Sequence, residues 1–416
     1  MKVFNDPQAV LRQTRLVASF LEFVKIDTQS DDTSNTNPST AKQLALQTVL
    51  RDRLTALGCT EIVLDEKGYL YATLPGNAPG APVVGLIAHV DTAPDYSGTN
   101  VRPRLHENYA GGPLVLENEV VITPADSPEL DRCHGDTIIT ASGDTLLGAD
   151  DKAGIAEILA ALEILAADPA IRRPTIRIAF TPDEEVGRGA EFFNVKGYRA
   201  DCAYTLDGDV AGEVNFETFS ADKAEVTFTG VAVHPGMAKG KMVNAIRLLG
   251  KFVDKLPKKE SPEETADREG FFHPTKIEGN AAEARVEMIL RDFDNRRLAR
   301  RGKRVKALAE RFVKLEPRLK VKVEIKKQYR NMADILKKHP QVRDHLMQAV
   351  RDAGLEPKIL PIRGGTDGSG LTAMGLPTPN LFTGGMNFHG PREWISTRVM
   401  GLAVCTVLNL VQRWVE

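Results

Sequence analysis

The sequence predicts an α/β protein, in which a mostly parallel sheet is covered by helices and a smaller domain is inserted into the larger one. Short apolar strands alternate with helical segments through residue 207, which is the order of parallel strands joined by helices. After about residue 219 the order becomes strand, helix, strand, strand, helix, strand, which is typical of a ferredoxin-like βαββαβ sandwich. The 416 residues also exceed what one hydrophobic core usually supports. We therefore expect two domains.

The larger domain should begin with two helices and then build its sheet. Apolar periodicity predicts helices over residues 10–26 and 41–57, the second ending at Gly58. Apolar runs predict strands at residues 83–89, 175–181 and 203–207. An Ala- and Leu-rich helix should follow the two aspartates at 150 and 151.

The inserted domain is expected over residues 219–327, and the larger domain over residues 1–218 and 328–416. Alternating polarity predicts the strands of the insertion, and amphipathic periodicity predicts its helices. Its strands are expected at 223–230, 270–278, 285–291 and 319–326, with helices at 243–256 and 295–315. A helix at 340–354, glycine-rich loops and a final helix should then complete the larger domain.

The composition argues against nucleic acid and membrane as partners. A formal charge of −2 provides no general attraction to either surface. The basic run at residues 296–306 is interpreted as a helix with one packed face, because Leu298 and Val305 interrupt its charges. No apolar stretch approaches the roughly 20 residues of a membrane span, and the start lacks the apolar core of a signal peptide. Four widely spaced cysteines are typical of reduced thiols, so we expect a cytoplasmic protein.

Acidic and imidazole side chains gather where the predicted strands end. Glu184 and Glu185 follow one strand, and His89 and Asp91 end another with a spacing that puts both side chains on the same side. Asp207 ends a third strand. In an open α/β sheet, ligands collect beyond the carboxyl ends of the strands, so these residues should lie close together.

Two further segments add to the same constellation. Asp150 and Asp151 precede a helix, and spacing alone does not choose between them, since carboxylates also cap helices. His389 lies in a glycine-rich loop. Histidine, aspartate and glutamate are the ligand types of a catalytic zinc site, so the pattern predicts a metal-dependent enzyme.

The motifs resemble those of the co-catalytic dizinc metallopeptidases, and in particular the peptidase T subfamily of tripeptide aminopeptidases. The subfamily resemblance rests on the intact Gly-Ala-Asp-Asp-Lys-Ala-Gly-Ile-Ala-Glu and Arg-Gly-Gly-Thr-Asp-Gly blocks. The resemblance implies a dizinc exopeptidase-like catalytic domain, with the insertion as a lid that could also form a homodimer. The matching segments run in family order along the chain, at residues 89–91, 147–154, 180–187, 205–208, 233–236, 289–294, 361–368 and 382–390.

The resemblance also implies a ligand set for two zinc ions per subunit. One ion would be held by His89 and Asp207, and the other by Glu185 and His389. It favours Asp150 over Asp151 as the carboxylate that bridges the two ions, followed by a cis peptide bond.

Roles in catalysis and substrate binding follow from the same resemblance. Glu184 is expected to be the general base and Asp91 to orient His89. Four residues are expected to contact a short free peptide, with Arg363 as a guanidinium that could hold its C-terminal carboxylate. These four residues are His234, Asn244, Arg291 and Arg363.

The resemblance therefore implies an aminopeptidase that removes the N-terminal residue of tripeptides with a hydroxide activated by two zinc ions. A dipeptidase or an N-acyl-amino-acid amidohydrolase would use the same metal chemistry, and lid and pocket residues decide between them. A catalytically silent peptide-binding paralogue is a third hypothesis. Glu184 argues against it, because a binding protein needs no general base.

Overall fold

The computed structural model describes residues 1–416, which form two compact units. The first, which we call the catalytic unit, comprises Met1–Phe216, Asp334–Leu360 and Thr366–Glu416. The second, the inserted unit, comprises Glu217–Ala333 and Pro361–Gly365.

The inserted unit therefore extends a few residues beyond the expected range of 219–327 and also takes in a later segment. The later segment joins it through backbone hydrogen bonds that local sequence patterns do not reveal. Ile362 donates to the carbonyl of Glu217 at 2.9 Å, and Phe219 donates to the carbonyl of Ile362 at 3.1 Å.

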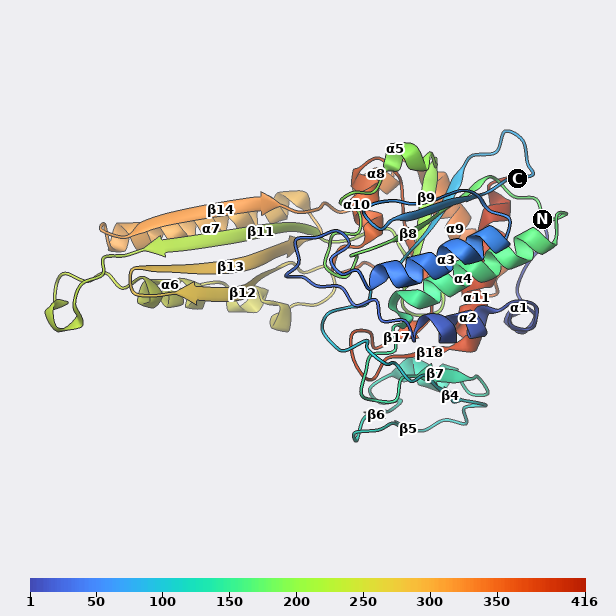
Figure 1. Ribbon diagram of the computed structural model, residues 1–416. Coiled ribbons are helices and arrows are strands. Elements are labelled where there is room, and N and C mark those ends of the chain that lie inside the picture. The colour runs from blue at the N-terminus through green and yellow to red at the C-terminus, as the bar shows by residue number, and fades with distance from the viewer. The chain divides into compact units, whose positions relative to one another are not determined.

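An eight-stranded sheet forms the centre of the catalytic unit (Figure 1). Its neighbouring central strands β8, β3, β9 and β16 are parallel. At the two sides, β2 pairs antiparallel with β8 and β10 pairs antiparallel with β16. β1 then pairs antiparallel with β2, and β15 pairs in parallel with β10. All residues of β3 and β8 are buried, as in a sheet covered on both faces. The order across the sheet is β1 (Thr60–Leu64), β2 (Leu70–Leu74), β8 (Ile176–Thr181), β3 (Val84–His89), β9 (Cys202–Gly208), β16 (Asn380–Phe382), β10 (Glu213–Asn215) and β15 (Lys358–Ile359).

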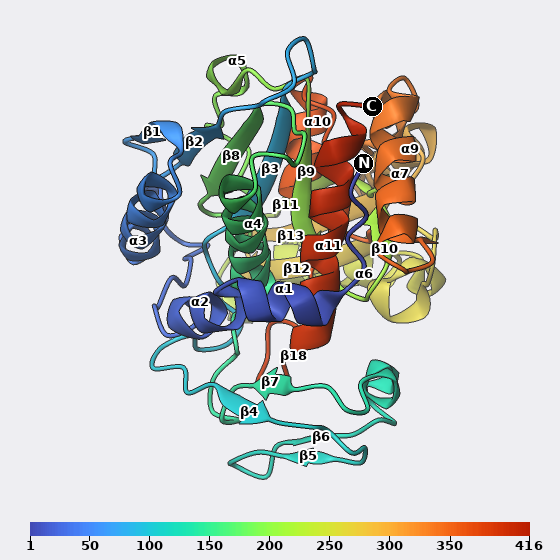
Figure 2. The same cartoon turned by 90° about the vertical axis from the view of Figure 1, so that its right-hand side faces the viewer.

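Helices cover this sheet on both sides. Figure 2 shows α4 (Ala149–Ala167) and α11 (Thr397–Arg413) side by side across one face. The other face packs against α5 (Val195–Tyr198) and α10 (Asp367–Ala373) through an apolar cluster that includes Ile87 and Tyr198. The remaining helices of this unit are α1 (Pro7–Gln13), α2 (Leu16–Phe23), α3 (Gln43–Ala56) and α9 (Pro340–Asp352), and α8 (Ala333–Leu336) begins at the boundary between the units.

The prediction of a single helix over residues 10–26 was wrong, because α1 and α2 are two separate helices. Thr14 is extended, with φ −125° and ψ 169°, and its side chain donates to the carbonyl of Val10 at 2.9 Å. The same hydroxyl accepts from the backbone N–H of Leu16 at 3.3 Å. A threonine that bonds to the backbone on both sides offers an alternative to continuous helix.

A small sheet that the sequence did not reveal lies at the edge of the catalytic unit. Its four antiparallel strands are ordered β17 (Gly385–Met386), β18 (Trp394–Ser396), β7 (Ile138–Thr140) and β4 (Arg104–His106). A two-stranded sheet of β5 (Leu114–Val115) and β6 (Val121–Ile122) and the 3₁₀ turn Pro128–Arg132 lie in the same part of the chain. The pairing of β18 with β7 brings the loop before Trp394 close to the start of α4.

The inserted unit confirms the predicted βαββαβ order. Its antiparallel sheet is ordered β12, β13, β11, β14, and two helices pack against one face around a core that includes Phe228, Phe252 and Phe312 (Figure 1). The elements are β11 (Ser220–Thr229), α6 (Ala245–Asp254), β12 (Phe271–Gly279), β13 (Glu283–Asp292), α7 (Asn295–Leu315) and β14 (Lys320–Lys327), with short 3₁₀ turns at Pro235–Met237, Lys258–Glu260 and Pro262–Glu264.

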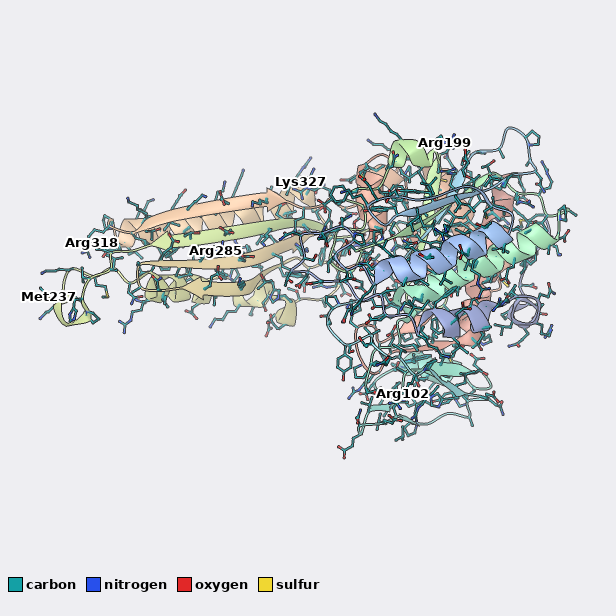
Figure 3. All side chains as sticks on the ribbon, in the orientation of Figure 1. Arg102, Arg199, Met237, Arg285, Arg318 and Lys327 are labelled. Carbon is teal, nitrogen blue, oxygen red and sulfur yellow. The ribbon has the colours of Figure 1, made fainter.

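The sheet of the inserted unit has ion pairs along and between its strands. Arg285 on β13, labelled in Figure 3, lies 3.5 Å from Glu225 on β11 and 3.4 Å from Glu287 on its own strand. Figure 3 also shows Met237 and Arg318 at one end of this unit and Lys327 at the other. Among all helices of the structure, none combines the length and hydropathy needed to cross a membrane.

Candidate metal centre

The predicted ligands come together at one edge of the central sheet. His89 is the last residue of β3, Asp207 lies near the end of β9, and Glu185 follows β8. Because β8, β3 and β9 are adjacent and parallel, their carboxyl ends meet. Asp150, at the start of α4, and His389, between β17 and β18, complete the group.

The carboxylate of Asp150 lies between the two histidines. Its Oδ1 is 2.8 Å from Nε2 of His89, and its Oδ2 is 3.5 Å from Nε2 of His389. Asp207 Oδ1 lies 3.7 Å from His89 Nε2, and Glu185 Oε2 lies 2.9 Å from His389 Nε2. The five side chains therefore divide into two histidine–carboxylate pairs with the Asp150 carboxylate between them.

Asp151 is also near this group, but its oxygens are used elsewhere. Its Oδ2 accepts from the backbone N–H of His89 at 3.1 Å, and its Oδ1 accepts from that of Gly154 at 3.2 Å. Its ligand atom nevertheless lies within 4.8 Å of those of His89 and Asp207. Asp150 faces both histidines, so the geometry favours it as the shared carboxylate. The peptide bond between Asp150 and Asp151 is cis, as the resemblance implied.

Asp91 is fully buried and holds two parts of the site. Its carboxylate accepts from the backbone N–H of Glu184 at 3.0 Å and of Glu185 at 3.1 Å. Nδ1 of His89 lies 3.1 Å from the carbonyl of Asp91 and 3.4 Å from its carboxylate. A histidine whose Nδ1 is held in this way keeps Nε2 available as a ligand.

The two adjacent glutamates face different surroundings. Glu185 is 5% exposed and contacts His389, and its Oε1 is buried with no hydrogen-bond partner. Glu184 is half-buried, as is Glu185 when the whole residue is counted, and its carboxylate forms no ion pair. The carboxylate of Glu185 is held against His389, which suits a ligand, whereas that of Glu184 has no such ion-pair partner.

The site concentrates negative charge. Burial raises the pKa of Glu185 to about 8, and burial together with Asp207 raises the pKa of Glu184 well above its ordinary range. Hydrogen bonds to Asp150 and Glu185 raise the pKa of His389 to about 11. Burial opposes ionisation of Asp150, yet hydrogen bonds to His389 and His89 lower its pKa. Histidine and carboxylate groups must be deprotonated to bind a metal, so a cation bound here would displace protons from these side chains.

These residues fit a pair of divalent cations. Two groups have ligand atoms within 4.8 Å of one another: His89 with Asp151 and Asp207, and His89 with Asp150 and Glu185. The unpaired buried oxygen of Glu185 is an acceptor that a cation would satisfy. Imidazole and carboxylate donors suit zinc, and also other divalent first-row metals.

Sequence reasoning missed three acidic residues that support the site. Asp183 accepts from the backbone N–H of Ser39 at 2.8 and 2.9 Å and from Gln43 at 2.7 Å, next to the two glutamates. Asp95 lies 3.5 Å from Nδ1 of His389, and Glu393 binds the backbone that leads into Asp150. Asp95 is four residues beyond Asp91, and Glu393 is four residues beyond His389, but nothing in that spacing marks a contact.

The four expected substrate residues lie in the inserted unit, on separate elements. His234 caps the turn Pro235–Met237 and is exposed, and Asn244 caps α6 through the N–H of Arg247 at 3.1 Å. Arg291 donates to Gln328 at 3.2 Å. Arg363 donates to the backbone carbonyls of Thr265, Asp267 and Glu269 at 2.8–3.2 Å, so its guanidinium is held within this unit.

Sequence comparison finds close relatives over nearly the whole chain. Residues 145–413 match the model of Peptidase family M20/M25/M40. Peptidase T from Exiguobacterium sp. is 47% identical over 412 residues, which cover 97% of this chain and 99% of the relative. Peptidase T from Desulfitobacterium hafniense is 48% identical over 404 residues, covering 96% and 98%.

Comparison with solved structures supports the fold. The aminopeptidase PepT from Bacillus cereus superposes with a TM-score of 0.76 at 23% identity, covering 97% of this chain and 98% of that one. A tripeptidase from Staphylococcus aureus gives a TM-score of 0.75 at 22% identity and covers 99% of each chain. A dinuclear metal-binding peptidase from Bacillus subtilis, of the M20 family, gives 0.66 at 13% identity, covering 97% and 98%.

Proposed function

Because the chain belongs to Peptidase family M20/M25/M40 and within it to the peptidase T group, we propose that it is a tripeptide aminopeptidase that uses two zinc ions. The observation that supports the two-metal site most directly is the Asp150 carboxylate. Each of its oxygens faces a different histidine, and each histidine has its own acidic neighbour. That is the arrangement in which one carboxylate can serve two ions.

The proposed ligands are His89 and Asp207 for one ion, His389 and Glu185 for the other, and Asp150 for both. Ions bound there would supply Lewis acidity, which lowers the pKa of a shared water and polarises the scissile carbonyl. The protein's part is to keep the five donors in place. Asp91 contributes by accepting from the backbone of both glutamates while facing Nδ1 of His89.

Glu184 is the proposed general base. It is adjacent to a proposed ligand, and its carboxylate has no ion-pair partner. Burial and the nearby Asp207 raise its pKa above the ordinary value, which is the direction that suits a general base. It would accept a proton from water and pass it to the departing amine.

Residues of the inserted unit are proposed to complete substrate recognition. His234 is exposed and could donate to the carbonyl oxygen of the peptide. Asn244, Arg291 and Arg363 are proposed to contact the remainder of a short free peptide. Because Arg363 is bound to three carbonyls of its own unit, binding a C-terminal carboxylate would require it to exchange some of those hydrogen bonds.

The setting proposed for this activity is the cytoplasm, with the inserted unit as a lid that could also form a homodimer. All four cysteines are buried and free, which supports a reducing compartment.

Replacing the two adjacent glutamates one at a time tests the proposed roles. Glu184→Gln should lower kcat by about 100-fold or more, because a glutamine cannot take a proton, and should leave the metal content unchanged. Glu185→Gln is the matched control, since it makes the same chemical change one residue away and should lose metal as well as activity. The measurements are kcat on a free tripeptide and metal content by mass spectrometry. Wild-type kcat in Glu184→Gln, or metal loss equal to that of Glu185→Gln, would contradict the assignment.

A further inference from the structure

A buried glutamate outside the proposed ligand set binds the backbone that leads into Asp150. Glu393 directly precedes β18 and is 1% exposed. Its Oε2 accepts from the N–H groups of Leu147 at 2.6 Å and Gly148 at 2.8 Å. Its Oε1 accepts from those of Ala149 at 2.6 Å and Asp150 at 3.2 Å. Four consecutive backbone donors therefore converge on one carboxylate.

The four N–H groups favour a negatively charged group at the position of the Glu393 carboxylate. Successive N–H groups that turn toward one centre form a concave site for negative charge. Gly148 provides the bend, with a φ of +81° that residues other than glycine rarely adopt. Because the last of the four N–H groups belongs to Asp150, the position of Glu393 fixes the backbone of the proposed bridging ligand.

Glu393 also belongs to the loop that carries the proposed ligand His389. Glu393 lies four residues after His389 in the loop between β17 and β18. The antiparallel pairing of β18 with β7 anchors the end of that loop, through Trp394 opposite Thr140. One side chain thus connects the loop of His389 with the turn of Asp150.

We propose that Glu393 is a positioning residue of the metal centre, which sets the distance between Asp150 and His389 and thereby the affinity of the site for its cations. This inference rests on the two-metal centre proposed above. Glu393 itself is not a proposed ligand, because both of its carboxylate oxygens accept from backbone N–H groups. Partners that hold metal ligands in place typically change metal affinity about 10- to 100-fold when they are replaced.

Glutamine is the informative replacement because it keeps the size of the side chain. It retains one oxygen acceptor, but its amide N–H₂ would face two of the backbone N–H groups. Glu393→Asp keeps the charge and both acceptors on a shorter side chain. Glu157→Gln is the matched control, because Glu157 is also a fully buried glutamate of the catalytic unit and its carboxylate has no hydrogen-bond partner.

The experiment measures zinc binding to the full-length chain and its three variants by competition with a chromophoric chelator, and thermal unfolding of the metal-free proteins. We expect Glu393→Gln to bind zinc about 10- to 100-fold more weakly than wild type, Glu393→Asp to fall between them, and Glu157→Gln to match wild type. Wild-type zinc affinity in Glu393→Gln would overturn the proposal, whatever happens to its unfolding temperature.

The aspartate variant keeps the test decisive if the glutamine variant does not fold. If metal-free Glu393→Gln is unfolded, zinc affinity in Glu393→Asp decides: a weakened affinity supports the proposal and a wild-type affinity overturns it. The readout needs no peptide, so it is separate from the proposed activity. A wild-type protein that binds two zinc ions and cleaves no tripeptide would contradict the activity alone.

Discussion

At the scale of the residue, the buried carboxylates of the catalytic unit differ mainly in the partners that they have. Asp91 accepts from two backbone N–H groups, and Glu393 accepts from four. Glu157, on α4, is equally buried but neither of its oxygens has a partner. Burial without compensation disfavours the charged form, so the pKa of Glu157 is raised well above its ordinary value.

Glu157 should therefore make the stability of the protein fall as the pH rises. In the folded state it keeps its proton at pH values where the unfolded chain has lost it, so the folded state binds more protons. The contribution of this group is complete below the ordinary carboxyl pKa and is lost as the pH rises toward the raised folded value. The slope for one such group reaches about 1.4 kcal/mol per pH unit.

Glu157→Gln tests this expectation because it removes the titrating proton. The free energy of unfolding should be measured by urea denaturation between pH 5 and pH 8 for both proteins. The free energy of unfolding of the variant should increase relative to that of the wild type as the pH rises. Two parallel stability curves would show that Glu157 does not titrate as its burial implies.

At the scale of the element, α4 approaches β9 closely at Gly154, beside the proposed ligands. Gly154 permits this approach, since a Cβ there would lie 2.5 Å from Oδ1 of Asp151 and still closer to the carbonyl oxygen of Leu206. Leu206 directly precedes Asp207. The contact between helix and strand therefore also affects where the proposed ligand Asp207 lies.

Gly154→Ala should be destabilising, by about 1–3 kcal/mol, because the added methyl group overlaps backbone and carboxylate atoms. Gly250→Ala is the matched control, since Gly250 lies in α6 and a Cβ added there would have no atom within 4 Å. That substitution should stabilise the protein by about 0.5–1 kcal/mol, because alanine favours helix. Both free energies can be measured by denaturant unfolding. Equal effects in the two variants would mean that the close approach at Gly154 is not required.

Sequence patterns predicted the elements of this protein better than the contacts between them. The helix expected at residues 295–315 is α7, and the strand ends that carry His89 and Asp207 were found because apolar runs stop there. The four hydrogen bonds of Glu393 join residues 243–246 positions apart, and no local pattern encodes such a contact. For the same reason the sequence analysis placed Pro361–Gly365 in the larger domain, whereas in the structure this segment belongs to the inserted unit.

At the scale of the whole molecule, the two units have different shares in the proposed reaction. All five proposed ligands and Glu184 belong to the catalytic unit, and the four proposed substrate residues belong to the inserted unit. The inserted unit has its own hydrophobic core, with Val226, Phe228 and Phe252 fully buried. Metal binding should thus depend on the catalytic unit, whereas selection among peptides should depend on both.

Removal of the N-terminal residue of free tripeptides by a metal-activated hydroxide is the activity on which the proposed roles of Glu184 and the four substrate residues depend. It can be tested by mass-spectrometric product analysis after the zinc-loaded protein is incubated with a free tripeptide, its N-acetylated form and a matching dipeptide. We predict release of the N-terminal residue from the free tripeptide alone, and no release after the metal is removed by chelation. Cleavage of the acetylated peptide or the dipeptide instead would contradict this account and favour an amidohydrolase or dipeptidase. No cleavage by a protein that holds two ions would also contradict it and favour the peptide-binding hypothesis.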